Sequence, residues 1–327
     1  MRKALLIGIN NYPGSLKLSG CVNDINFLFP LLERNSNGDK NFDVKLLSDV
    51  QNSNEALDAI RQLFSDDADI ALLYFSGHGF SDDIGAQIVF PYDITNNGSC
   101  YNGIQLSSIL DLANKSKAKN RIVILDSCYS GFIGKLTPNS DASVIKHGVS
   151  IMTACREDEF AEEDGTHGLF TELLCSALTG GAADFLGNIT LGGIYAYIDR
   201  SLGAWHQRPV FKTNVTEFVP IRKVDASIPL ETIRLLPELF PDEKNEYLLD
   251  PSYEFTNSPN ERKIDIIRPY ATQQNVETFK ALQKLASINF VRPIGEEHMY
   301  YAAMHSKSCE LTTLGKYYKK LVQDGRI

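Results

Sequence analysis

A histidine and a cysteine each follow a short apolar run in this chain. Ala71–Gly79 reads ALLYFSGHG and contains His78, and Arg121–Gly131 reads RIVILDSCYSG and contains Cys128. Runs of this length, rich in Ile, Val, Leu and Tyr, are typical of strands that are buried on both faces. If the two strands are parallel neighbours, their carboxyl ends meet at one sheet edge, where α/β folds place their chemistry. A thiol would then lie beside an imidazole, as a nucleophile beside its base.

The spacing and the glycines favour this interpretation. His78 and Cys128 are 50 residues apart, which leaves room for the connection that a parallel strand pair needs. Gly77 and Gly79 leave space around His78 for a substrate backbone. The alternative is that both are ordinary core residues, because a lone cysteine after a strand is usually inert. The paired, glycine-bracketed context favours catalysis.

The segments YFSGHG and DSCYSG resemble the two motifs of the metacaspase-like branch of caspase-fold cysteine peptidases (peptidase family C14, clan CD), especially its bacterial members. The resemblance extends over about Lys3 to Val224, although the cysteine does not lie in the caspase pentapeptide itself. It implies a cysteine endopeptidase with a dyad of His78 and Cys128. It also implies that the backbone N–H groups of Cys128 and Gly79 stabilise the oxyanion.

Two aspartates could select the substrate. Asp126 lies two residues before Cys128 and therefore on the same face of the strand, where a carboxylate needs a partner. Metacaspase-like enzymes are similar in having Asp at this position, in the pocket for Arg or Lys, and the segment GCVND points to Asp24 as the second pocket acid. Two carboxylates would hold a guanidinium and reject an acidic side chain. Alternatively, Asp24 is a helix N-terminal charge and Asp126 a structural acid.

The pattern of residues 1–224 predicts an α/β fold: a caspase-like, doubly wound and largely parallel sheet with helices on both faces. Besides the two runs above, the expected strands are Lys3–Ile9, Asp43–Leu47, Val149–Thr153 and one or two strands within Trp205–Val219, with a short extended piece at Gln87–Tyr92. The expected helices are Cys21–Asn35, Asn52 to about Phe64 with Asn52 as its cap, Leu106–Ala113, Leu169–Leu178 and Thr190–Leu202 with Thr190 as its cap.

The composition changes after residue 224. Residues 225–270 contain six prolines and are expected to be a linker with short helices. Residues 271–327 predict a smaller α+β domain that resembles a winged helix and would be regulatory. Its expected elements are a helix at Val276–Ile288, a hairpin formed by Phe290–Ile294 and His298–Met304, and a helix at Thr312–Asp324 that stops at Gly325.

Charge and composition restrict the partners. The net charge of −9 disfavours nucleic acid, and residues 225–327 hold 13 Lys and Arg against 15 Asp and Glu, without the basic bias of a DNA-reading module. No apolar run approaches the length of a membrane span. The apolar run that follows Met1-Arg2-Lys3 is too short for a signal peptide. Six cysteines without pairing rhythm fit reduced thiols, so a cytoplasmic location is expected.

The expected partners are protein or peptide substrates, with a small-molecule or protein activator at the C-terminal region. By resemblance, the chain would be a regulated effector in bacterial defence or cell death. Two other functions remain open: a catalytically silent caspase-like scaffold, and a DNA-binding regulator acting through the C-terminal domain.

Weaker signals lie in the loops. Glu157–Asp164 has six acids in eight residues and reads as a solvated loop, a lining for basic substrates, or a Ca²⁺ site without EF-hand spacing. No cofactor is expected, and Ca²⁺ is the one candidate. Lys135 and Lys146 are candidate self-cleavage sites, and Trp205 could border a substrate groove. The remaining histidines are expected to be surface or structural: His147, His167, His206, His298 and His305.

Overall fold

The computed structural model describes residues 1–81, 85–94, 103–127, 144–154, 167–202, 208–242, 244–259 and 266–327. The chain divides into two compact units, unit 1 (Met1–Asp225) and unit 2 (Ala226–Ile327).

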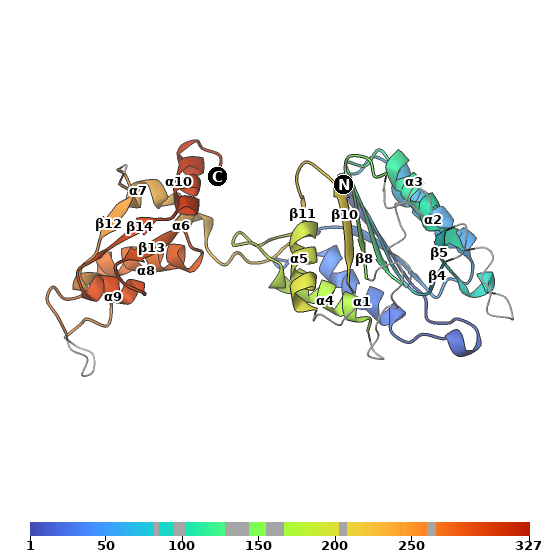
Figure 1. The fold of residues 1–327 in the computed structure, drawn as a ribbon, viewed down its shortest axis with the longest axis horizontal. Helices are drawn as coiled ribbons and strands as arrows, with labels where there is room; N and C mark the ends of the chain where they lie inside the picture. Colours follow the sequence, from blue (N-terminus) through green and yellow to red (C-terminus); the bar gives the residue numbers. More distant parts are fainter. Residues whose placement is uncertain are drawn as a thin grey trace. The chain divides into compact units, whose positions relative to one another are not determined.

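The core of unit 1 is a six-stranded sheet with the order β10-β8-β7-β3-β1-β2 (Figure 1). Its strands are β1 (Arg2–Gly8), β2 (Asp43–Ser48), β3 (Ile70–Ser76), β7 (Asn120–Asp126), β8 (Val149–Thr153) and β10 (Val210–Asn214). Every pair is parallel except β8 with β10, which is antiparallel. The predicted, largely parallel α/β sheet is therefore confirmed.

Side chains of one strand alternate between two cores because successive residues point to opposite sheet faces. Leu5 and Ile7 join the core under α2 (Ser53–Ser65) and α3 (Leu106–Lys115). Ala4 and Leu6 join the core under α1 (Cys21–Glu33), α4 (Leu169–Ser176) and α5 (Leu191–Ser201). Helices thus cover both faces of the sheet, as expected for a doubly wound fold (Figure 1).

The two predicted helix caps are present. The Asn52 side chain accepts a hydrogen bond from Glu55 N at the start of α2, and Thr190 Oγ1 accepts one from Gly193 N at the start of α5. Each cap satisfies a backbone donor that the first helical turn leaves without a partner.

Smaller elements complete unit 1. A three-stranded sheet follows β3 and consists of β4 (Gly79–Ser81), β5 (Ala86–Ile88) and β6 (Ile104–Gln105). A two-stranded sheet pairs β9 (Asn188–Thr190) with β11 (Pro220–Lys223). Two 3₁₀ turns lie at Gly14–Leu16 and Pro91–Asp93, so the extended piece expected at Gln87–Tyr92 ends in a turn.

Unit 2 is an α+β arrangement around a three-stranded sheet with the order β12-β14-β13. The strands are β12 (Glu246–Leu248), β13 (Val291–Ile294) and β14 (Ser308–Leu311). The helices are α6 (Leu230–Arg234), α7 (Leu236–Leu239), α8 (Gln273–Ser287), α9 (Met299–Met304) and α10 (Thr313–Gln323). Residues expected to form a linker therefore supply α6, α7 and β12 to this unit.

The prediction of a hairpin in unit 2 is wrong. Met299–Met304 forms α9, and β13 pairs instead with β14, which lies beyond that helix. Met299, Ala302 and Ala303 are buried at helical spacing, which packs one side of α9 onto the unit. The connection between the two strands is thus a helix rather than the tight turn of a winged-helix hairpin.

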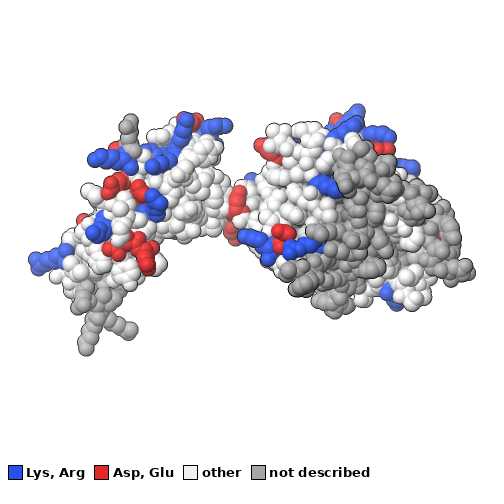
Figure 2. Space-filling model, viewed as in Figure 1, with Lys and Arg blue, Asp and Glu red and all other residues white. Residues whose placement is uncertain are grey.

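Charges of both signs are interspersed on the face of unit 2 drawn in Figure 2. Arg292 pairs with Glu310 across β13 and β14. Within the described residues, no helix combines the length and apolar character that crossing a bilayer requires.

Candidate active site

The strands that precede His78 and Cys128 are parallel neighbours. Ser76 at the end of β3 pairs in register with Asp126 at the end of β7, and Gly77 N donates a hydrogen bond to the Asp126 carbonyl oxygen at 3.3 Å. His78 follows two residues after Ser76. Cys128 follows two residues after Asp126 and lies outside the described residues. The register brings the carboxyl ends of β3 and β7 to the same sheet edge, and the predicted parallel pairing of these two strands is confirmed.

The imidazole of His78 is held by a backbone carbonyl. His78 Nε2 lies 2.7 Å from the carbonyl oxygen of Leu16, in the 3₁₀ turn before α1. Because a carbonyl only accepts hydrogen bonds, Nε2 carries the proton when this bond forms. The neutral ring therefore keeps Nδ1 as its proton acceptor.

Tyr12 holds the backbone of His78. The buried Tyr12 hydroxyl accepts from His78 N at 3.0 Å and donates to the Val89 carbonyl oxygen at 2.9 Å. Its ring contacts the imidazole edge-on, with centroids 4.5 Å apart. Burial raises the pKa of Tyr12 well above its ordinary value, so the hydroxyl keeps the proton it donates. The Tyr12 hydroxyl lies so close to the backbone of Gly77 that a Cβ added to this glycine would be 2.6 Å from the hydroxyl oxygen.

Asp24 is buried in the first turn of α1, with a relative exposure of 1%. Its Oδ2 accepts from Ser76 Oγ at 2.8 Å. Its Oδ1 accepts from Gly168 N at 3.1 Å and faces His167 Nδ1 at 3.2 Å. Burial raises the pKa of Asp24, although these hydrogen bonds oppose the shift. This acid is therefore built into the site rather than solvated at the helix terminus.

Asp126 is a second buried acid near Asp24, with a relative exposure of 5%. Its Oδ2 accepts from Thr171 Oγ1 at 2.6 Å, and Thr171 also hydrogen-bonds the buried Tyr74. A Cβ on Gly168 would lie 2.6 Å from Asp126 Oδ2 and 3.5 Å from Asp24 Oδ2. The two carboxylates therefore both border Gly168, and the structure brings together the two acids that the sequence singled out.

The caspase-domain family model, Peptidase_C14, matches residues 1–219. The chain belongs to the caspase family.

Among curated relatives, Metacaspase-4 of Arabidopsis thaliana is 28% identical over 197 residues, which is 55% of this chain and 44% of that protein. Metacaspase-1 of Saccharomyces cerevisiae is 26% identical over 219 residues, 62% of this chain and 47% of that protein. The chain thus spans less than half the length of these relatives. A crystal structure of a Geobacter sulfurreducens protein has a TM-score of 0.50 at 19% identity, covering 69% of this chain and all of that one, and shows the same fold.

Four side chains of this caspase-family site were not foreseen from the sequence. Tyr12 lies in the polar stretch between the first predicted strand and the first predicted helix, and Ser76 and Thr171 lie in an ordinary strand and an ordinary helix pattern. His167 was expected to be surface or structural, but its ring faces Asp24. None of the four stands in a local pattern that predicts its contact, because each partner is distant in the sequence.

The described cysteines do not resemble nucleophiles. Cys21, Cys175 and Cys309 are buried thiols, and burial raises the pKa of both Cys175 and Cys309 to about 12. A thiol with a raised pKa is rarely ionised and reacts slowly. These three thiols are therefore poor candidates for the nucleophile, and Cys128 is the candidate because of its sequence motif.

Several loop predictions fall outside the described residues: Glu157–Asp164 with its Ca²⁺ option, Lys135, Trp205 and His206. Gly79, the second predicted oxyanion donor, is the first residue of β4 and is half-buried. Lys146 is exposed before β8. Among the described residues, no three His, Cys, Asp or Glu side chains gather as metal ligands would.

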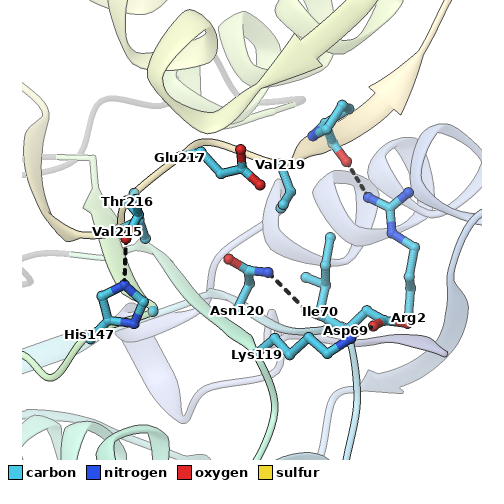
Figure 3. Close-up of a pocket in the computed structure, with 12 residues that line it drawn as sticks. Arg2, Asp69, Ile70, Lys119, Asn120, His147, Val215, Thr216, Glu217 and Val219 are labelled. Carbon is cyan, nitrogen blue, oxygen red and sulfur yellow. Dashed lines mark hydrogen bonds and ion pairs between the residues drawn. The ribbon is translucent and has the colours of Figure 1, made fainter. Parts of the chain in front are cut away.

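A cavity of about 580 Å³ lies at the opposite sheet edge (Figure 3). It borders the amino-terminal ends of β1, β3 and β7, where Arg2, Ile70 and Asn120 line it. Lys119 and Asp69 form an ion pair at its wall. Because His78 follows the carboxyl end of β3, this cavity is separate from the candidate active site.

Proposed function

We propose that this chain is a cysteine endopeptidase that cleaves proteins after Arg or Lys. The observation that carries the proposal is the pair of buried carboxylates, Asp24 and Asp126, beside the strand end that leads to His78. Membership in the caspase family and similarity to metacaspases support the reaction class.

The proposed reaction uses Cys128 as nucleophile and His78 as base. A cysteine with an ordinary pKa near ~8.5 is mostly protonated at neutral pH. His78 Nδ1 would take the thiol proton as sulfur attacks the substrate carbonyl, and would then deliver that proton to the leaving amine. Water activated by the same nitrogen would hydrolyse the thioester and release the thiol.

The contacts of His78 support this role. The bond from Nε2 to the Leu16 carbonyl oxygen, 2.7 Å, directs Nδ1 away from the 3₁₀ turn and holds the required tautomer. The backbone N–H groups of Gly79 and Cys128 are proposed to stabilise the oxyanion, in keeping with the position of Gly79 directly after His78.

The substrate's basic side chain would enter between the two carboxylates. The two carboxylates approach each other at Gly168, since a Cβ there would lie 2.6 Å from Asp126 Oδ2 and 3.5 Å from Asp24 Oδ2. A guanidinium or ammonium placed there would gain charge-assisted hydrogen bonds in a partly desolvated pocket. An acidic side chain would be repelled by both aspartates, so cleavage after Asp is disfavoured.

A regulated role is the broader part of the proposal. The caspase-domain match ends at residue 219, and residues 226–327 form a separate unit that could receive an activating partner or small signalling ligand. An effector role in bacterial defence or cell death follows from the family resemblance. The mixed charges of unit 2 favour a protein or small ligand over nucleic acid.

The deciding experiment measures cleavage of reporter peptides that end in Arg, Lys, citrulline or Asp, with and without candidate activators. We expect the Arg and Lys reporters to be cut and Cys128→Ala and His78→Ala to abolish cutting. Asp126→Asn should lose the preference for Arg over citrulline while retaining the dyad. Cleavage that persists in either dyad variant would exclude this mechanism.

A further inference from the structure

Asp24 has little hydrogen-bonding capacity left for a substrate. A carboxylate offers about four acceptor positions. Ser76 Oγ, Gly168 N and His167 Nδ1 occupy three of them, at 2.8, 3.1 and 3.2 Å. Ser76 and Gly168 belong to buried parts of the fold, whereas His167 is a partly exposed side chain. Of the three hydrogen-bond donors, His167 is therefore the one that can most easily move away from Asp24.

His167 lies where a substrate side chain would approach. Its side chain has a relative exposure of 30%, against 2% for Asp24, so it stands between the acid and solvent. Its ring contacts the ring of Phe27 of α1, with centroids 5.4 Å apart. The neighbouring Gly168 borders both pocket carboxylates.

Among the described residues, the carboxylates nearest to His167 and Gly168 come from two elements. Asp24 faces it from α1, and Asp126 of β7 lies against the adjacent Gly168. The acidic segment 157–164 precedes His167 in the chain and lies outside the described residues. A protonated imidazole here is therefore a cation placed beside the acids that would hold the substrate's own cation.

We propose that His167 is a specificity-determining residue that competes with the substrate's basic side chain for Asp24. The inference rests on the proposed cleavage after Arg or Lys. Neutral His167 donates one hydrogen bond and leaves the charge of Asp24 uncompensated. Protonated His167 cancels part of that charge and repels an incoming guanidinium. Recognition of basic residues should therefore be weaker at acidic than at neutral pH.

The test compares KM at pH 7.5 and pH 5.5 for reporter peptides ending in Arg and in the neutral isostere citrulline. In the wild-type enzyme, KM for the Arg reporter should rise about 2- to 5-fold at pH 5.5, as expected for a partly exposed ion pair, while KM for citrulline stays nearly constant. His167→Asn keeps a donor but cannot be protonated, so its KM for the Arg reporter should rise clearly less than that of the wild type. Any rise that remains would come from protonation of Asp24, whose pKa burial raises. His305→Asn removes a similar His–carboxylate pair, with Glu296 in unit 2, and should behave as wild type.

Calorimetry on the Cys128→Ala protein provides a readout that does not need turnover. A peptide with a C-terminal Arg should bind more weakly at pH 5.5 than at pH 7.5, and adding His167→Asn should clearly reduce the difference. A wild-type-like pH dependence in His167→Asn would overturn the role of His167. Absence of cleavage by the wild type, with pH-sensitive binding intact, would instead count against the proposed enzyme and leave the competition supported.

Discussion

The Nε2 atom of His78 lies 2.7 Å from the carbonyl oxygen of Leu16, a residue 62 positions earlier in the chain. That carbonyl is placed by the 3₁₀ turn Gly14–Leu16, which Gly14 enters with a φ of +60°. A side chain at this φ is strained, although the space around Gly14 is open. We expect Gly14→Ala to move the carbonyl and lower kcat about 10-fold, measured with an Arg reporter.

Gly38→Ala is the matched control for that variant. Gly38 also has a positive φ, +85°, and open space, but lies in a surface turn far along the chain from the 3₁₀ turn. Both variants should lose about 1 kcal/mol of unfolding free energy. Equal kcat values in the two variants would show that the Leu16 carbonyl does not position His78.

Tyr12→Phe removes the hydroxyl that joins His78 N to the Val89 carbonyl and leaves the ring in place. We expect kcat to fall about 10-fold with KM nearly unchanged, because the backbone of the base loosens while the acidic pocket stays intact. Tyr253→Phe breaks a comparable hydroxyl contact, with Tyr247 in unit 2, and should leave kcat at the wild-type value. Steady-state kinetics give kcat and KM separately and therefore distinguish a loss of kcat from weaker substrate binding.

Asp24→Asn should stabilise the fold at neutral pH while it weakens Arg recognition. An acid whose pKa is raised on folding adds stability below its unfolded pKa, and that stability is lost as the pH rises through the folded pKa. Burial raises the pKa of Asp24, so its ionised form is unfavourable at pH 7. We expect Asp24→Asn to have a higher Tm than wild type at pH 7 and a nearly equal Tm at pH 3.

Asp69→Asn should act with the opposite sign. The hydrogen bond and charge of Lys119 lower the pKa of Asp69 to about 2. A lowered pKa in an acid adds stability above the unfolded pKa, which is lost as the pH falls through the folded value. Asp69→Asn should therefore lower Tm at pH 7, and the difference should shrink between about pH 4 and pH 2. A lower Tm for both aspartate variants at pH 7 would contradict the assignment for Asp24.

Gly168→Ala should press a methyl group against the two pocket acids. The backbone φ of Gly168 is −71°, which alanine adopts without strain, so the effect would come from the Cβ placed 2.6 Å from Asp126 Oδ2. We expect at least a 10-fold loss of kcat/KM for the Arg reporter. Gly192→Ala is the control, because in α5 its Cβ meets the side chain of the exposed Phe218 and alanine favours helix.

The sheet and its helices could be predicted because their signals are local. Continuous apolar runs marked β1, β3, β7 and β8, and Asn52 and Thr190 marked helix starts. The two acids were found through motifs at strand and helix ends. In unit 2, the strand predicted to include Met299–Met304 was wrong because a six-residue apolar segment can form a strand or a buried helix, and only packing decides between them.

The contacts around the site could not be predicted in the same way. Tyr12 meets His78 across 66 residues, and His167 meets Asp24 across 143. Such pairs depend on how the parallel strands bring distant loops to one sheet edge. The polar composition of the loop around Tyr12 gave no sign that its ring would be buried.

The strand β12 affects how the chain can be dissected. Glu246–Leu248 forms one edge of the sheet in unit 2, although it lies in the proline-containing stretch before α8. A fragment beginning at residue 271 would leave β14 with an open backbone edge and invite self-association through strand pairing. A soluble C-terminal fragment should therefore begin near residue 226. Proteolysis between β12 and α8 would release a fragment that aggregates rather than one that folds independently.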